Sequence, residues 1–150
     1  MIKAFEDTPG EDGRFQLPPG IHVATWLEML ARFGSRTPAR NPRRPAARAA
    51  GAQAAGCRRA YVDGSLITSK EVPRDFDGCW DHADVDFDAL DPVLLDFEGH
   101  REAQKAKFDG EMFLAAAKAD RLGNRFLEFF QLDRDGRARG IIQIDLRGIP

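Results

Sequence analysis

The fold is decided by the segment YVDGSLITSKEVPRDFDG, which runs from Tyr61 to Gly78. Its apolar start leads into Gly64 and Ser65, and nine residues then precede an Asp-x-Asp pair made of Asp75 and Asp77. Side-chain direction repeats every two residues on a strand, so both carboxylates of the pair point to one face of a sheet. Two such carboxylates repel each other unless a cation lies between them. The segment therefore predicts a strand, a tight turn and a site for a divalent cation.

The turn at Gly64 and Ser65 has the chemistry of a phosphate-binding loop. It offers backbone N–H groups and a hydroxyl, and glycine lets a ligand approach the backbone closely. Lys70 follows in the same loop, where its ammonium group would meet the same phosphates. We therefore expect a nucleotide-binding site at Gly64, Ser65 and Lys70. An ordinary surface loop with a solvated lysine is the alternative interpretation.

The order of apolar strand, Gly-Ser, loop and Asp-x-Asp resembles the signature of the nucleotidyltransferase superfamily, which includes DNA polymerase β. Asp63 departs from this signature, which has an apolar residue directly before the glycine. The chain is also similar to a group of small bacterial proteins with a nucleotidyltransferase-like domain, whose activity is not established. That similarity lies in the segments Leu17–His22, Asp63–Lys70, Asp75–Trp80, Leu90–Phe97 and Phe126–Leu146.

The resemblance implies that Asp75 and Asp77 hold Mg²⁺ or Mn²⁺ and that a nucleoside triphosphate (NTP) is the substrate. In this superfamily the divalent cations neutralise the triphosphate and activate the attacking hydroxyl. The superfamily also needs a third carboxylate, from a later strand. Asp145 and Asp96 both lie in an apolar–acid–apolar pattern. The more regular strand around Asp145 favours it as catalytic residue and metal ligand, with Asp96 as the alternative.

The expected fold class is α/β (α+β), with a small mixed β-sheet flanked by helices, which the resemblance narrows to the minimal nucleotidyltransferase fold. The 150 residues suffice for one domain, so a single nucleotidyltransferase-like domain is expected over 1–150. Residues 1–20 predict an irregular N-terminal arm, because a Pro-Pro-Gly turn ends them. Residues 35–48 predict an arginine- and proline-rich connection.

Local patterns place the first elements of this domain. A capping box at Thr25–Glu28 predicts a helix that ends at Gly34, and alanines predict a second helix over Ala46–Ala55. Strands are predicted at Arg59–Asp63 and Asp75–Trp80, as antiparallel or neighbouring members of one sheet.

The C-terminal half is predicted to alternate between strands and helices. Pro92–Phe97 has strand character, whereas Gly99–Lys107 and Glu111–Leu122 have helical character. A turn signal within Phe126–Leu146 favours a β-hairpin there, whose second strand begins at Gly140.

The net charge of −2 hides a segregation of charge along the chain. Residues 35–60 hold seven arginines and no acid, whereas residues 75–98 hold nine acids and no lysine or arginine. Such asymmetry indicates either a basic contact surface beside a cation site or two solvated faces. The overall balance does not indicate a general nucleic-acid-binding protein, since those carry a clear positive charge.

The sequence also predicts where the protein works. No segment is apolar enough to span a membrane, and the acidic N-terminus lacks the apolar stretch of a signal peptide. Two cysteines, Cys57 and Cys79, do not make a disulfide scaffold. We therefore expect a cytoplasmic protein with reduced thiols and no membrane partner.

Two functions fit these patterns. The first is metal-dependent transfer of a nucleoside monophosphate from an NTP to a hydroxyl of a protein or nucleic acid. One small domain leaves little room to bind an acceptor, which favours a partner protein or RNA in that role. By analogy with minimal members of the superfamily, the chain would be the antitoxin-type member of a toxin–antitoxin pair. The second function is a catalytically inactive nucleotidyltransferase-fold module that binds a partner protein or nucleic acid.

Overall fold

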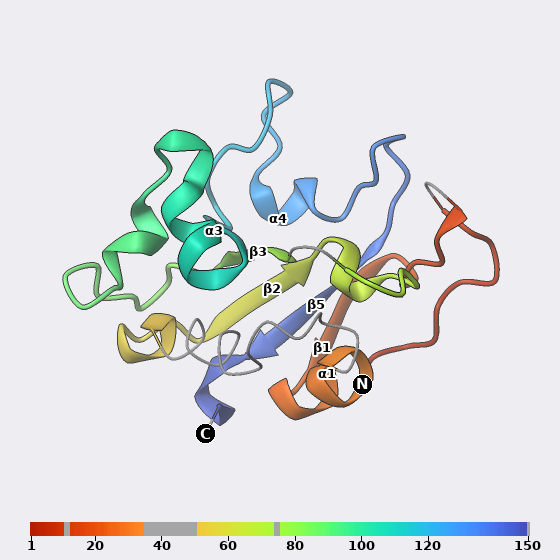
Figure 1. The fold of residues 1–150 in the computed structure, drawn as a ribbon, viewed down its shortest axis with the longest axis horizontal. Coiled ribbons are helices and arrows are strands. Elements are labelled where there is room, and N and C mark those ends of the chain that lie inside the picture. Colours follow the sequence, from red (N-terminus) through yellow and green to blue (C-terminus); the bar gives the residue numbers. More distant parts are fainter. Residues whose placement is uncertain (11–12, 35–50, 74–75, 150) are drawn as a thin grey trace.

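The computed structural model describes residues 1–10, 13–34, 51–73 and 76–149, and its strands form one sheet in the order β1-β5-β2-β3-β4 (Figure 1). Within these residues no helix is both long and apolar enough to cross a membrane. The strands are β1 (Gly20–Ala24), β2 (Arg59–Asp63), β3 (Phe76–Trp80), β4 (Gly110–Leu114) and β5 (Gly140–Asp145).

The sheet is mixed. The central strand β2 runs antiparallel to both of its neighbours, β3 and β5, whereas the outer pairs β1–β5 and β3–β4 are parallel. A mixed sheet with helices around it confirms the predicted α+β fold class. The antiparallel pairing of the two strands on either side of the Gly-Ser loop is also confirmed.

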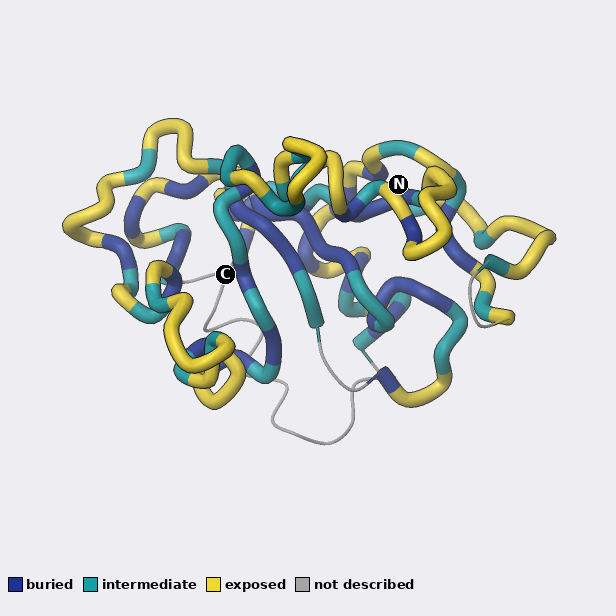
Figure 2. The backbone as a smooth tube through the Cα atoms, turned by 90° about the horizontal axis from the view of Figure 1, so that it is seen from above, coloured by how far each residue is buried: buried dark blue, intermediate teal, exposed yellow. Residues whose placement is uncertain are grey.

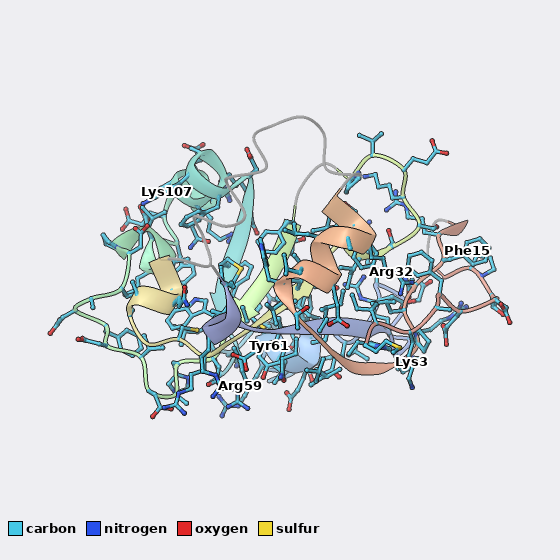
Figure 3. The ribbon with its side chains drawn as sticks, turned by 90° about the horizontal axis from the view of Figure 1, so that it is seen from below. Lys3, Phe15, Arg32, Arg59, Tyr61 and Lys107 are labelled. Atoms are coloured by element: carbon cyan, nitrogen blue, oxygen red, sulfur yellow. The ribbon has the colours of Figure 1, made fainter. Side chains whose placement is uncertain are left out.

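The two faces of the sheet carry separate cores, because side chains alternate along each strand. Val62, Trp80 and Ile142 belong to the larger core, to which helix α1 (Trp26–Phe33) contributes. Tyr61 and its neighbours on the other face pack against helix α4 (Phe126–Phe129) in a smaller core. The strands are the most buried part of the backbone (Figure 2), and Tyr61 lies on the side of β5 opposite α1 (Figure 3).

Helix α1 begins as its sequence predicts. The Thr25 hydroxyl accepts a hydrogen bond from the Glu28 N–H at 3.1 Å, and the Glu28 carboxylate accepts one from the Thr25 N–H at 2.8 Å. This capping box satisfies two N–H groups that the first turn would otherwise leave unpaired. Met29 and Phe33 then bury the apolar face of the helix in the larger core.

Helix α3 (Glu102–Phe108), predicted from the sequence, packs against the outer edge of the sheet. The fully buried Gln104 accepts a hydrogen bond from the Met112 N–H of β4 at 2.8 Å and donates one to the Asp96 carbonyl at 3.2 Å. An unpaired edge strand exposes N–H groups that can pair with other chains. Gln104 satisfies one of these N–H groups and fixes α3 to β4.

Two elements of the C-terminal half differ from the prediction. The helix predicted over Glu111–Leu122 is wrong, because strand β4 occupies Gly110–Leu114 and turns follow it. The strand predicted over Pro92–Phe97 is also wrong, because Pro92–Leu95 form a 3₁₀ helix. Asp91 caps that helix by accepting from the Val93 N–H, and proline suits the first helical position because it has no N–H to leave unpaired.

The predicted hairpin over Phe126–Leu146 is wrong as well. Its first part folds into α4, and β5 pairs with β1 and β2 instead. Only an isolated bridge between Leu132 and Ala138 joins the two parts. Phe126 and Phe130 lie one helical turn apart and both contact the ring of Phe113, so burial of these aromatic rings favours the helix.

Two further segments complete the comparison. Strand β1 was not predicted as a strand, although the described residues before it, 1–10 and 13–19, hold no α-helix or strand, as expected of the arm. The arginine- and proline-rich connection at 35–48 and the start of the alanine-rich helix lie outside the described residues. The described end of that helix is helical over 51–54 and closes at Gly56 in a left-handed conformation, with φ of 89°.

Candidate active site

The turn after β2 packs directly against β3. Gly64 has φ of 86° and ψ of −167°, a region that only glycine adopts readily. A Cβ atom there would lie 3.2 Å from Oδ2 of Asp77 and 3.3 Å from its backbone nitrogen. The absence of a side chain at Gly64 therefore lets the Asp77 carboxylate lie against the turn.

The rest of the loop folds back on itself. Ser65 begins a short 3₁₀ helix, Ser65–Ile67, and its carbonyl accepts from the Thr68 hydroxyl at 2.9 Å. The N-terminal arm fixes the loop, since the Phe15 N–H donates to the Ser69 hydroxyl at 2.9 Å. Lys70 follows this contact, and its backbone N–H donates to the Thr68 hydroxyl at 3.3 Å. Ser65 and Lys70 thus belong to an ordered loop that begins beside Asp77.

Asp63, the residue that departs from the superfamily signature, is buried at the end of β2. Only 3% of it is exposed, and its Oδ2 lies 2.5 Å from the guanidinium of Arg139. Its Oδ1 is buried with no hydrogen-bond partner among the described residues. Burial raises the pKa of Asp63 to about 6, although Arg139 and the Gly64 backbone N–H act in the opposite direction.

Glu111 on β4 is a third carboxylate that the sequence analysis missed. It is the register partner of Asp77 in the parallel β3–β4 pair. Its oxygens lie 3.1 Å from Arg101 Nε and 2.8 Å from Lys105 Nζ. Burial raises the pKa of Glu111, but the neighbouring cations Lys105 and Arg101 outweigh burial and hold it below its ordinary value. The signal in the sequence was an acid followed by an apolar run in GEMFL, which the alanines after it obscured.

Asp63, Asp77 and Glu111 form one row across three neighbouring strands, which we call the acidic row. Asp63 is paired with Asp77, and Asp77 with Glu111. Side-chain alternation puts all three on the face of Tyr61, Cys79 and Phe113. Neighbouring strands lie about 4.8 Å apart, so the row spans about 10 Å. Cations lie at both of its ends, Arg139 beside Asp63 and the pair Arg101 and Lys105 beside Glu111.

The structure does not bring the predicted third carboxylates into this row. Asp145 is paired with Arg59, four residues before Asp63 on β2, so it lies about 13 Å away along the strand. It pairs with Arg147, and hydrogen bonds from Arg147 lower the pKa of Asp145 to about 2. Asp96 lies beyond a 3₁₀ helix, where its carboxylate accepts from the Glu98 N–H at 3.1 Å.

A divalent cation suits part of this arrangement. The acidic row offers carboxylate oxygens, the ligands that Mg²⁺ and Mn²⁺ prefer. Within the described residues, however, no group of three His, Cys, Asp or Glu side chains is arranged to hold a metal ion. Asp75, the other half of the predicted metal-binding pair, lies outside the described residues. A cation bound by Asp75, Asp77 and Glu111 would therefore require Glu111 to leave Arg101 and Lys105.

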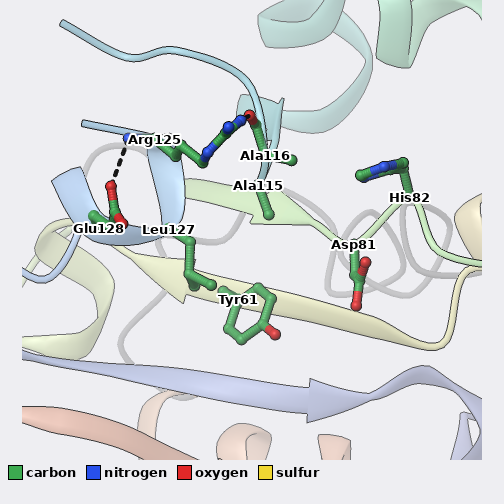
Figure 4. A pocket seen from close by; sticks show the side chains of 8 residues that line it. All are labelled: Tyr61, Asp81, His82, Ala115, Ala116, Arg125, Leu127 and Glu128. Carbon is green, nitrogen blue, oxygen red and sulfur yellow. Dashed lines mark hydrogen bonds between the residues drawn. The ribbon is translucent and has the colours of Figure 1, made fainter. Parts of the chain in front are cut away.

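A separate pocket lies on the same face of the sheet, near the other end of β3 (Figure 4). Its volume of about 220 Å³ is below the range of about 300–1,000 Å³ usual for pockets that bind drug-sized ligands. None of the residues predicted to bind nucleotide, Gly64, Ser65 and Lys70, lines this pocket. Its walls combine apolar and charged side chains, from Tyr61, Asp81, His82, Ala115, Ala116, Arg125, Leu127 and Glu128.

The sequence matches one protein family over nearly its whole length. The family is described as "Family of unknown function (DUF6932)", and the match covers residues 9–145. The chain belongs to the DUF6932 family. The matched residues of this DUF6932 chain include all five strands and the whole acidic row. Neither the curated proteins nor the solved structures gave a match to the chain.

Proposed function

We propose that this DUF6932 chain is a metal-dependent nucleotidyltransferase, which transfers a nucleoside monophosphate from an NTP to a hydroxyl of a protein or nucleic acid. The observation that carries the proposal is the register of β2 and β3, which sets the Gly64 turn against the carboxylate of Asp77. A phosphate bound at that turn would lie beside the carboxylate that holds its counter-cation. Glu111 adds a further carboxylate from the next strand.

The residues of the site have separate roles in this proposal. The backbone N–H groups at Gly64 and Ser65, with Lys70 from the same loop, bind phosphate oxygens. Asp77, together with Asp75, would hold Mg²⁺ or Mn²⁺, which neutralises the triphosphate and activates the attacking hydroxyl. Glu111 takes the part of third carboxylate that the sequence assigned to Asp145 or Asp96, and it accepts the proton of the acceptor hydroxyl.

Arg139 supports the site at the Asp63 end of the row. It pairs with Asp63, and its Nε also donates to the Phe130 carbonyl at 3.2 Å. These contacts fix the end of β2 immediately before Gly64. Pairing Asp63 with Arg139 also offsets a like charge beside Asp77, which favours the ionised form of the Asp77 carboxylate.

The proposal is tested by label transfer from α-labelled ATP, GTP, CTP and UTP in host lysate, with Mg²⁺ or Mn²⁺. The wild type is compared with Asp77→Asn and with Asp145→Asn, a matched acid at the far end of the same sheet face. We expect a labelled protein or RNA with the wild type and Asp145→Asn, and none with Asp77→Asn. A labelled protein would support a toxin-like partner as acceptor, and a labelled RNA would support a nucleic-acid acceptor. No label with any nucleotide, together with no metal-dependent nucleotide binding, would overturn the proposal.

The second candidate function is a catalytically inactive module that binds a partner protein or nucleic acid. It is favoured by the ion pairs of Glu111, whose two oxygens both contact protein cations instead of facing an open metal site. In that case the acidic row is a structural network, and Asp77→Asn leaves every binding property of the chain unchanged. This candidate would be supported if the wild type and Asp77→Asn both captured the same partner and if neither needed a metal ion to do so.

A further inference from the structure

The single negative charge of Glu111 is paired with two positive charges. Its carboxylate contacts Arg101 and Lys105 at 3.1 and 2.8 Å, so two cations share one anion. Arg101 immediately precedes α3 and Lys105 lies within it, and both side chains reach the Glu111 carboxylate. We call Arg101 and Lys105 the α3 cation pair. Together with Glu111, the pair carries a net charge of one positive unit.

The guanidinium of Arg101 is incompletely hydrogen-bonded in this cluster. Its Nε is near the Glu111 carboxylate, yet this N–H is buried without a hydrogen bond among the described residues. The guanidinium also lies over the ring of Phe113, 5.3 Å from its centroid, which fixes its plane. A guanidinium binds a phosphate or carboxylate best by donating two parallel N–H groups to two oxygens. Here one Glu111 oxygen contacts Arg101 and the other contacts Lys105.

The backbone that carries Arg101 is strained. Gly99, His100 and Arg101 have φ of 51°, 55° and 63°, so three consecutive residues are left-handed. For a non-glycine residue this conformation is sterically unfavourable. Such strain concentrates at ligand clamps and switch segments, where bound ligands compensate for it. Arg101, one of the two non-glycine residues in this conformation, is the one whose side chain reaches the acidic row.

The position of the cluster connects it to the proposed reaction. Glu111 is the neighbour of Asp77, and the Gly64 turn is the neighbour of Asp77 on the other side. The α3 cation pair thus lies about 10 Å from the turn, across two strand spacings. Phosphates held at the turn and a cation held at Asp77 would reach toward Arg101 and Lys105.

We propose that Arg101 and Lys105 bind the phosphate groups of the nucleotide. In the absence of nucleotide, the Glu111 carboxylate occupies the position of those phosphate groups. Phosphate oxygens replace the Glu111 carboxylate on the two cations, and Glu111 then turns to the side of Asp77. The inference rests on the proposed function for the identity of the ligand. The exchange explains why the third carboxylate pairs with cations in this state.

The exchange is tested by calorimetric titration of inorganic tripolyphosphate into the protein in EDTA, so that no metal takes part. Glu111→Gln removes the competing anion, and we expect tripolyphosphate to bind about tenfold more tightly than to the wild type. Lys105→Met should weaken binding about tenfold, and Arg101→Met should do the same.

The same helix offers a matched control. Lys107 pairs with Asp91, and the exposures of these side chains, 49% and 17%, match those of Lys105 and Glu111, 50% and 16%. Asp91→Asn frees Lys107 but keeps the cap on the Val93 N–H. It should leave the affinity for tripolyphosphate unchanged, because Lys107 lies outside the α3 cation pair.

Unchanged or weaker tripolyphosphate binding by a folded Glu111→Gln protein would overturn the inference. If that variant fails to fold, Lys105→Met decides, because Lys105 is half exposed and its loss leaves the core intact. Label transfer that depends on Asp77, with no effect of Glu111→Gln on tripolyphosphate, would sink this inference alone. The expected tripolyphosphate pattern with no label transfer would leave the anion site standing and sink the nucleotidyltransferase proposal.

Discussion

Gly64 lies so close to Asp77 that a Cβ atom on Gly64 would be only 3.2 Å from the Asp77 carboxylate. The contact exists because β2 and β3 pair with Asp63 opposite Asp77, so the turn after β2 lies over the start of β3. This relationship joins the two halves of the Tyr61–Gly78 segment. The predictions below begin with it.

Gly64→Ala should destabilise the protein by about 2–4 kcal/mol. An alanine in this backbone conformation costs about 1–3 kcal/mol, and the contact with Asp77 adds a steric term. Gly136→Ala is the matched control, because Gly136 also has a positive φ, 77°, but open space around it. Urea denaturation of both variants measures the difference. Equal costs at the two positions would show that the Asp77 carboxylate does not lie against the turn.

The buried Asp63 should make stability fall as pH rises from about 4 to 6. An acid whose pKa is higher in the folded state binds its proton more tightly there, so folding is favoured below the unfolded pKa of 3.8. This advantage, at most about 3 kcal/mol, is lost as pH approaches the folded pKa of about 6.

The measurement is the free energy of unfolding at pH 4, 5, 6 and 7 for the wild type and Asp63→Asn. The difference between them should change with pH in that window. Asp145→Asn is the control, and its difference from the wild type should stay constant over this pH range. The pKa of Asp145 is lowered to about 2, so the stability that it adds is present above its unfolded pKa and is lost only in stronger acid. A pH-independent difference for Asp63→Asn would contradict the raised pKa.

Gln104→Leu should cost about 2–4 kcal/mol. The fully buried amide accepts from the Met112 N–H and donates to the Asp96 carbonyl, and leucine removes both bonds and leaves the Met112 N–H buried without its partner. Hydrogen exchange should show faster exchange at the Met112 amide, with little change in β2. A cost below about 0.5 kcal/mol would mean that Gln104 does not fix α3 to β4.

Cys57 and Cys79 should resist thiol reagents in the folded protein. Both thiols are free, with 2% and 0% of each residue exposed. Burial raises the pKa of Cys57 to about 11 and that of Cys79 to about 12, so very little reactive thiolate forms at pH 8. Ellman's reagent should label neither thiol natively and both in guanidinium chloride. Rapid native labelling of Cys79 would contradict its place beneath α4.

Elements with strong local signals could be predicted from the sequence. The capping box of α1, the alternation of β5 and the apolar start of β2 are each written in adjacent residues. The missed elements take their conformation from distant contacts. Strand β4 depends on its pairing with β3 and on the Gln104 amide, and α4 depends on packing of its rings against Phe113.

The same division applies to the candidate site. The sequence by itself determined that a Gly-Ser turn and an acidic strand follow each other across one loop, because these residues are neighbours along the chain. Only the tertiary structure decided that Glu111, and not Asp145 or Asp96, completes the acidic row. Strand order and register set which residues meet across a sheet, and these depend on the packing of both faces at once. Asp145 has the better local pattern, but it lies on β5 opposite Arg59, at the end of β2 away from Asp63. Glu111 lies beside Asp77.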